Sequence, residues 1–272
     1  MKTAFSTVAC MGSGWKSVLA WAAAARQDAV EIRLESDGSA FGASGNGVKE
    51  IADGFRQAGI AISDIGTSIR FSEYSEEALK RAEQAAALAE QLGAVGIRVF
   101  PGSFVKRFSE KTEHDLVGMA RFLRRASEIA KSHGAQIWIE THNEFSAGKV
   151  MRHLLDLTDR PNVKVIWDLI HPFEYGEPPE ETLEYLGGFI AHVHVKDGKR
   201  PNDPDIIDWT YTKLGEGGLP IKQMLDLLEG SGYSGYYSLE WENAWRPEIR
   251  NIYRSMPELL SDWNAFLTAL RN

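Results

Sequence analysis

Residues 136–143 read QIWIETHN, a short apolar run that ends on the acidic residue Glu140. Isoleucine and tryptophan favour β-strands, and the side chains of a strand alternate between its two faces. Glu140 therefore shares a face with Trp138, while Ile137 and Ile139 take the other face and can pack against helices. The run predicts a strand that carries a carboxylate at its C-terminal end.

Three later runs repeat this pattern, each with a polar side chain near its end. They are VKVIWD at 163–168, AHVHVKD at 191–197 and YYSLEWE at 236–242, and the side chains are Asp168, His194 and Glu240. Similar runs occur earlier in the chain. The candidate strands are 3–9, 29–35, 60–67, 94–100, 136–141, 163–168, 190–195 and 236–241.

Amphipathic stretches separate these strands. Helix starts are expected near Trp15, Val48, Glu76, Glu113, Ala147, Glu180, Pro220 and Glu248. Strand–helix units in unbroken succession predict a parallel sheet covered by helices. Their number and the chain length favour an α/β fold of the (β/α)8 TIM barrel type, as a single domain over residues 1–272. A doubly wound open sheet is the alternative, but it needs fewer strands and usually a glycine-rich first turn.

The composition argues against several classes of protein. The 272 residues carry a net charge of −8, which disfavours a nucleic-acid partner because phosphate contacts need clustered Lys and Arg. Cys10 is the only cysteine, so neither an intramolecular disulfide nor a Cys-rich zinc site can form. We find no apolar run of the roughly 18 residues that a membrane span needs, and the N-terminus reads as a strand rather than a signal peptide. The expectation is a cytoplasmic protein.

The strand ends of a parallel barrel meet at one rim, so Glu140, Asp168, His194 and Glu240 are expected to converge. A single acid at a strand end is commonly a helix cap, but a polar set at the ends of consecutive strands indicates a shared site. Converging carboxylates repel one another unless a cation or a proton lies between them. One imidazole with carboxylate oxygens suits Mn2+, Mg2+ or Co2+, whereas Zn2+ usually takes more nitrogen or sulfur. The pattern predicts one divalent cation, with Mn2+ expected first.

The succession ETHN, WDLIHP, HVHVKD and SLEWE resembles the xylose isomerase-like barrels. That group includes tagatose 3-epimerase-like and hydroxypyruvate isomerase-like enzymes and the inosose and 3-dehydroshikimate dehydratases. The resemblance covers nearly the whole chain and implies that the four residues named above bind the metal. The family's Asp-x-x-His motif falls on Asp168 and His171. The Arg that its epimerases place six residues beyond the metal His falls on Arg200, followed here by a longer loop.

The resemblance implies an isomerase or epimerase of a keto sugar or keto polyol that works through an enediolate. Glu140 and Glu240 would each bind the metal through one oxygen and transfer a proton through the other. His171 would hydrogen-bond a substrate oxygen, and Arg200 would bind hydroxyls. His142 either orients the ligands or belongs to a polar loop. Barrels of this group often pair, so a homodimer or homotetramer is the expected assembly.

The same centre suits the loss of water, and a hydro-lyase acting on a cyclic keto substrate such as 3-dehydroshikimate or inosose is the alternative. Arg98, at the end of the fourth strand, and Lys196, after the seventh, would then face an anionic substrate group. Glu31, Arg33 and Glu35 alternate on one face of the second strand. Arg33 and Arg98 are therefore also candidates for structural partners of barrel carboxylates.

Two other classes fit the sequence less well. A DNA-repair endonuclease of the same superfamily would need additional His and Asp ligands for zinc and a basic groove, which the net charge disfavours. A metal-binding barrel without catalysis is disfavoured by the pair of glutamates at the centre.

Overall fold

The predicted parallel barrel is confirmed by the computed structural model, which describes residues 1–71, 75–102, 110–203 and 206–271. The barrel strands are β1 (Lys2–Ser6), β2 (Ala29–Arg33), β3 (Ala61–Arg70), β4 (Gly96–Phe100), β5 (Gln136–Glu140), β6 (Val163–Asp168), β7 (Ile190–Val195) and β10 (Tyr236–Leu239). Parallel pairing of β1 with β10 closes the sheet, with Phe5 opposite Leu239. Neighbouring strand ends, from β5 through β6 and β7 to β10, consequently lie side by side at one rim.

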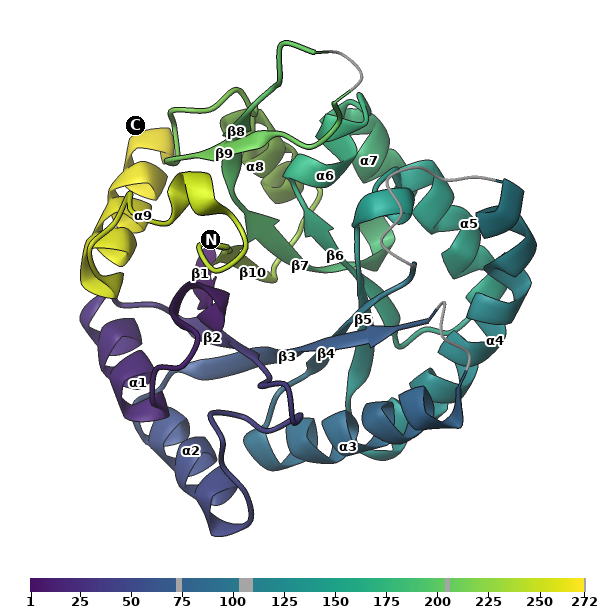
Figure 1. Cartoon of the computed structure of the whole chain (residues 1–272), viewed down its shortest axis with the longest axis horizontal. Helices are drawn as coiled ribbons and strands as arrows, with labels where there is room; N and C mark the ends of the chain where they lie inside the picture. The colour runs from purple at the N-terminus through teal and green to yellow at the C-terminus, as the bar shows by residue number, and fades with distance from the viewer. Residues whose placement is uncertain (72–74, 103–109, 204–205, 272) are drawn as a thin grey trace.

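Helices surround the strands in a ring, and α9 lies beside α1 where the ring closes (Figure 1). They are α1 (Trp15–Ala24), α2 (Asn46–Gln57), α3 (Glu76–Leu92), α4 (Glu110–Ser132), α5 (Gly148–Thr158), α6 (Ile170–Glu174), α7 (Pro179–Leu186), α8 (Ile221–Gly230) and α9 (Met256–Arg271). Short 3-10 turns follow some strands and helices: Thr7–Cys10, Asn143–Phe145, Gly187–Phe189 and Pro247–Ile249. Among the described residues, no helix is long and apolar enough to cross a membrane.

Helix α3 illustrates how the local sequence builds these units. The Ser75 side chain accepts a hydrogen bond from the Ala78 N–H at 3.1 Å, which satisfies a free donor of the first turn. A row of alanines on the inner face, including Ala82 and Ala86, is buried and lets the helix pack closely on the sheet. Gly93 ends the helix with a left-handed backbone (φ 74°), which glycine adopts without a Cβ clash.

The expectations differ from the structure in three places. Strand β1 ends at Ser6, because residues Thr7–Cys10 turn into a 3-10 helix. The last helix, expected from Glu248, begins instead at Met256, where Ser255 Oγ accepts from the Glu258 N–H at 3.4 Å. The long loop after β7 contains an unpredicted antiparallel hairpin, β8 (Asp197–Lys199) with β9 (Thr210–Thr212).

Candidate metal centre

The predicted ligands converge at the C-terminal rim of the barrel. One donor atom of each of Glu140, Asp168, His194 and Glu240 lies within 4.8 Å of the others. All are buried, with at most 4% of the side chain exposed. The strand register accounts for this arrangement, since Asp168 on β6 pairs with His194 on β7 and Glu240 directly follows β10.

The orientation of His194 supports a cation in this cluster. Its Nε2 lies 2.9 Å from Oε2 of Glu31. Its Nδ1 lies 3.3 Å from Oε2 of Glu240 and 3.8 Å from Oε1 of Glu140, and it has no hydrogen-bond partner in the described part of the chain. With the proton on Nε2, the Nδ1 lone pair faces carboxylate oxygens that only accept hydrogen bonds. A metal ion or a second proton is needed between them, so these residues fit a divalent cation.

The charges around His194 lead to the same conclusion. Burial by itself lowers the pKa of His194, but Glu240, Glu31 and Glu140 raise it well above its ordinary value. The imidazole therefore takes up a proton when no metal ion balances these carboxylates. A bound cation would replace that proton, which makes metal binding sensitive to pH.

Cationic side chains hold the outer oxygens of the carboxylates. Arg98 Nη1 donates to Oε2 of Glu140 at 2.6 Å, and this pair keeps the Glu140 pKa well below its ordinary value although burial raises it. Lys196 Nζ lies 2.7 Å from Oδ2 of Asp168 and 2.5 Å from Oε2 of Glu240. Two of the predicted substrate-binding cations, Arg98 and Lys196, are thus paired with carboxylates of the centre itself.

Two histidines lie next to the cluster. Nε2 of His171 is 3.4 Å from Oδ2 of Asp168, and its Nδ1 is 2.9 Å from Oε2 of Glu174. Burial lowers the pKa of His171, but these two carboxylates raise it to about 9. The ring of His142 packs edge-on against that of His171 at 4.7 Å, and burial lowers the His142 pKa to about 3. The site thus sets a charged imidazole beside a neutral one.

A polar layer that sequence reasoning did not resolve lies beneath His194. Glu31 is fully buried; its Oε1 accepts from Ser6 Oγ at 3.0 Å and its Oε2 from Ser238 Oγ at 3.3 Å. Nε2 of His192 is 3.5 Å from Oε2 of Glu31, and His192 is fully buried, consistent with an interior histidine. The alternation of Glu31, Arg33 and Glu35 predicted that they share one face of the second strand, but it did not predict which residues they contact.

Arg200 is not brought to the cluster. It is exposed after β8, and in the described ranges it pairs with none of the four carboxylate and imidazole residues. Arg246, which the sequence did not single out, lines a cavity of about 180 Å³ together with His142 and His171. Its guanidinium pairs with Asp208 at 2.7 Å. The sequence clue was its position six residues beyond Glu240, in the loop that follows β10.

A second cavity, of about 300 Å³, opens directly onto the ligands. It is lined by Val8, Arg33, Ser68, Arg98, Phe100, Glu140, His142, Glu240, Glu242 and Trp245. Trp245 is 52% exposed and offers an apolar surface at this mouth, whereas Trp241 is buried and packs on Tyr253. We take this cavity, rather than a larger one elsewhere, as the substrate site because it contains two of the candidate ligands.

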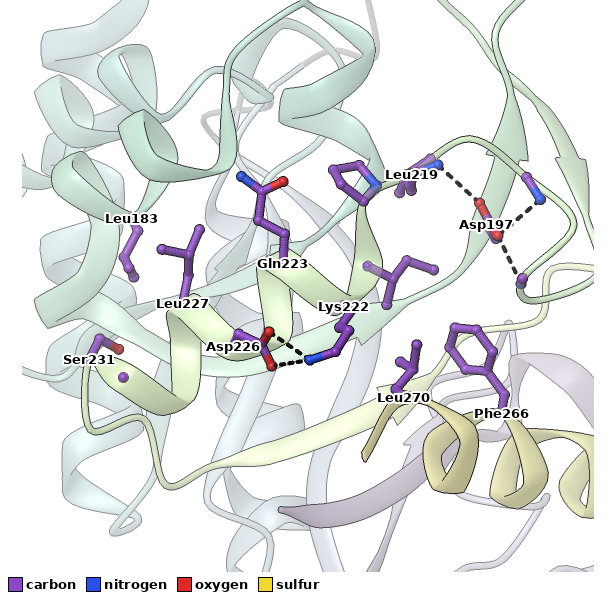
Figure 2. Close-up of a pocket in the computed structure, with 15 residues that line it drawn as sticks. Leu183, Asp197, Leu219, Lys222, Gln223, Asp226, Leu227, Ser231, Phe266 and Leu270 are labelled. Atoms are coloured by element: carbon purple, nitrogen blue, oxygen red, sulfur yellow. Dashed lines mark hydrogen bonds and ion pairs between the residues drawn. The ribbon is translucent and has the colours of Figure 1, made fainter. Parts of the chain in front are cut away.

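A larger groove, about 980 Å³, lies on the flank of the barrel along α8 and α9 (Figure 2). None of the four candidate ligands lines it. At its edge the Asp197 carboxylate accepts from the N–H groups of Gly215, Gly217 and Leu219 (Figure 2). These hydrogen bonds hold the loop that leads into α8, so the Asp197 carboxylate and backbone N–H groups fix the shape of this end of the groove.

Comparisons with known proteins identify epimerases and dehydratases among the relatives. The chain is 28% identical to 3-dehydroshikimate dehydratase of Bacillus anthracis over 137 residues, which are 49% of this chain and 46% of the relative. It is 24% identical to fructoselysine 3-epimerase of Escherichia coli O157:H7 over 145 residues, 52% of this chain and 50% of the relative. The matched part thus spans about half the length of these curated relatives.

The fold comparison extends over the whole chain. The solved structure of the IOLI protein with a bound zinc atom superposes with a TM-score of 0.83 at 19% identity, covering 99% of this chain and 98% of that one. The family model described as xylose isomerase-like TIM barrel matches residues 19–262. The chain therefore belongs to the xylose isomerase-like TIM barrel family.

Proposed function

We propose that this protein is a divalent-metal-dependent isomerase or epimerase of a keto sugar or keto polyol. The observation that carries the proposal is the Nδ1 atom of His194, which faces Glu140 and Glu240 without a hydrogen bond, with Asp168 beside it. When bound, the cation would polarise a substrate carbonyl and stabilise negative charge on its oxygen. The carboxylate-rich donor set favours Mn2+, Mg2+ or Co2+ over Zn2+.

The two glutamates are not equivalent, and this defines their proposed roles. The contacts of Glu240 fall on Oε2, from His194 and Lys196, so its Oε1 is the better-placed proton acceptor among the described residues. In Glu140 both oxygens face partners, Oε2 accepting from Arg98 and Oε1 lying 3.8 Å from Nδ1 of His194, so it is the less available base. We assign proton removal to Glu240 and the opposite transfer to Glu140, with His171 and His142 beside the substrate oxygens.

The pairing of Glu140 with Arg98 also favours a second candidate, the dehydratase. Loss of water needs one base to take the carbon-bound proton, while the C–O bond breaks and the hydroxyl departs as water with a proton from an acid. Glu240 alone supplies that base. The relationship to 3-dehydroshikimate dehydratase supports this candidate, and the relationship to fructoselysine 3-epimerase supports the first.

Mass spectrometry in deuterated water tests the proposal. The Mn2+-loaded protein is incubated with keto sugars, inosose and 3-dehydroshikimate. Deuterium incorporation without loss of water identifies an isomerase or epimerase, whereas loss of one water with new ultraviolet absorbance identifies a dehydratase. Full activity after exhaustive chelation would contradict metal dependence. Zn2+, Mg2+ and Co2+ are compared with Mn2+ in the same assay.

A further inference from the structure

Arg33 lines the cavity of about 300 Å³ that also contains Glu140 and Glu240, but it is paired with no carboxylate in the described part of the chain. Its guanidinium donates to the carbonyl oxygens of Leu34, at 3.1 Å, and Gly66, at 2.9 Å, and to the hydroxyl of Ser68. All of these partners are neutral. A guanidinium has five N–H donors, so two remain available.

The strand register places a second guanidinium next to it. Arg33 on β2 pairs with Gly66 on β3, and Gly66 pairs with Arg98 on β4. A Cβ at Gly66 would lie 3.0 Å from Nη2 of Arg98 and 3.5 Å from Cδ of Arg33. The missing side chain thus leaves room for both guanidinium groups across one strand. Arg98 lowers the pKa of Arg33, as expected of like charges, while Glu31, Glu140 and Glu240 oppose that shift.

Of the two guanidiniums, Arg98 forms an ion pair with a described residue and Arg33 does not. Glu140 neutralises Arg98, whose Nε is nevertheless buried without a hydrogen-bond partner among the described residues. Burial and the neighbouring Arg98 lower the pKa of Arg33 to about 10, so Arg33 remains charged at neutral pH. Glu240 and Glu242, the other acids on the cavity wall, are both held by Lys196. Each acid on the cavity wall is thus paired with Arg98 or Lys196, whereas Arg33 forms no ion pair among the described residues and keeps N–H donors available.

We infer that Arg33 and Ser68, with Arg98 behind them, form a subsite for an acidic group, a carboxylate or a phosphate, on the substrate. This inference rests on the proposed function, because the same cavity presents the substrate to Glu140 and Glu240. A planar guanidinium binds such a group with paired charge-assisted hydrogen bonds, which a neutral hydroxyl cannot match. The expected substrate is thus a small keto compound with an acidic group beyond the reacting carbons.

Binding of three matched six-carbon ligands tests the subsite by titration calorimetry of the Mn2+-loaded protein. Sorbitol is neutral, gluconate carries a carboxylate and sorbitol 6-phosphate carries a phosphate, and none of them has the ketone or aldehyde group that the proposed reaction needs. We expect at least one anion to bind about tenfold or more tightly than sorbitol, and Arg33→Gln to remove that preference. Which anion binds more tightly identifies the acidic group.

Matched variants separate recognition from structural support. Arg56→Gln removes an exposed guanidinium on α2 and should leave all three affinities unchanged. A purely structural Arg33 would weaken the three ligands equally, and that result would overturn the inference. Arg33→Gln also removes hydrogen bonds to two backbone carbonyls, so circular dichroism checks that the variant folds. If it does not fold, Arg33→Lys and Ser68→Ala are tested instead. Each of these is expected to weaken the binding of the two anions and not that of sorbitol.

The remaining outcomes distinguish this inference from the proposed function. Absence of any preference for the anions, in a protein that binds Mn2+ and turns over neutral keto sugars, overturns the subsite alone. Arg33-dependent binding of an anion in a protein that takes up no divalent cation supports the subsite but contradicts the proposed function.

Discussion

Nε2 of His194 lies 2.9 Å from Oε2 of Glu31, although 163 positions separate the two residues in the sequence. Glu31 is itself held by Ser6 and Ser238, so the imidazole is fixed with Nδ1 toward Glu140 and Glu240. A hydrogen bond to the second nitrogen of a ligand histidine selects its tautomer and raises its affinity for a metal. The metal affinity of the proposed centre would therefore depend on Glu31, which lies outside the proposed set of ligands.

Glu31→Gln is expected to weaken Mn2+ binding roughly 10- to 100-fold, because the amide holds the imidazole less firmly than the carboxylate. Titration calorimetry measures the affinity. Glu35→Gln, the control, removes one negative charge just beyond β2 and should leave the Mn2+ affinity unchanged. Equal Mn2+ affinities for Glu31→Gln and the unmodified protein would refute the orienting role.

Glu240→Gln is expected to lower turnover by about 10²- to 10⁴-fold, because the amide has no basic oxygen for the carbon-bound proton. Steady-state kinetics measures the loss, and circular dichroism confirms the fold. Glu50→Gln, an exposed position on α2, serves as the control. Retention of normal turnover in Glu240→Gln would exclude Glu240 as the base.

Lys196→Met is expected to destabilise the metal-free protein by about 3–5 kcal/mol, because it leaves Asp168 and Glu240 buried without their cation. Saturating Mn2+ should raise the free energy of unfolding more in this variant than in the unmodified protein, because the ion replaces the lost positive charge. Urea unfolding with and without Mn2+ measures both effects. Lys213→Met, which breaks a more exposed pair with Asp262, should show neither large effect.

Asp64→Asn is expected to stabilise the metal-free protein at pH 8 by roughly 1–3 kcal/mol and to have a smaller effect at pH 4. Burial, together with the Glu31 charge, raises the Asp64 pKa from 3.8 to about 6. The folded state then binds a proton more tightly than the unfolded state, so stability falls as pH rises from about 4 to 6. Urea unfolding at pH 4, 6 and 8 measures the trend. Asp226→Asn, on the exposed face of α8, should show no such trend.

Gly217→Ala is expected to destabilise the protein by about 1–3 kcal/mol, because a Cβ there would lie 1.9 Å from Oδ1 of Asp197 and 2.6 Å from the Gly198 carbonyl oxygen. Gly218→Ala is the neighbouring control, since its Cβ would meet nothing closer than 3.7 Å. Thermal unfolding compares the two. Equal melting temperatures would mean that Asp197 does not hold this loop.

Local sequence patterns predicted the barrel and brought four candidate ligands to one rim. The reason is physical: side chains alternate along each strand, and the ends of consecutive parallel strands are neighbours. Knowing the strand that ends at Glu140 and the strand that ends at Asp168 is therefore enough to place both acids together. The helix start expected near Glu76 is likewise confirmed, with Ser75 as its N-cap.

The choice of partners was decided only by the tertiary structure. Periodicity assigns Glu31 and Arg33 to the barrel interior, but it does not show that Glu31 holds His194 or that Arg33 bonds to backbone carbonyls rather than to a carboxylate of the described residues. Those outcomes depend on distances of a few ångströms between atoms on different strands. The hairpin after β7 likewise left Arg200 exposed, because hydrogen bonds between distant loop segments fix its path. The sequence determines which face of a strand a side chain takes and at which rim of the barrel it lies. Three-dimensional packing determines which charged groups form pairs, because Coulomb and hydrogen-bond energies change steeply over a few ångströms.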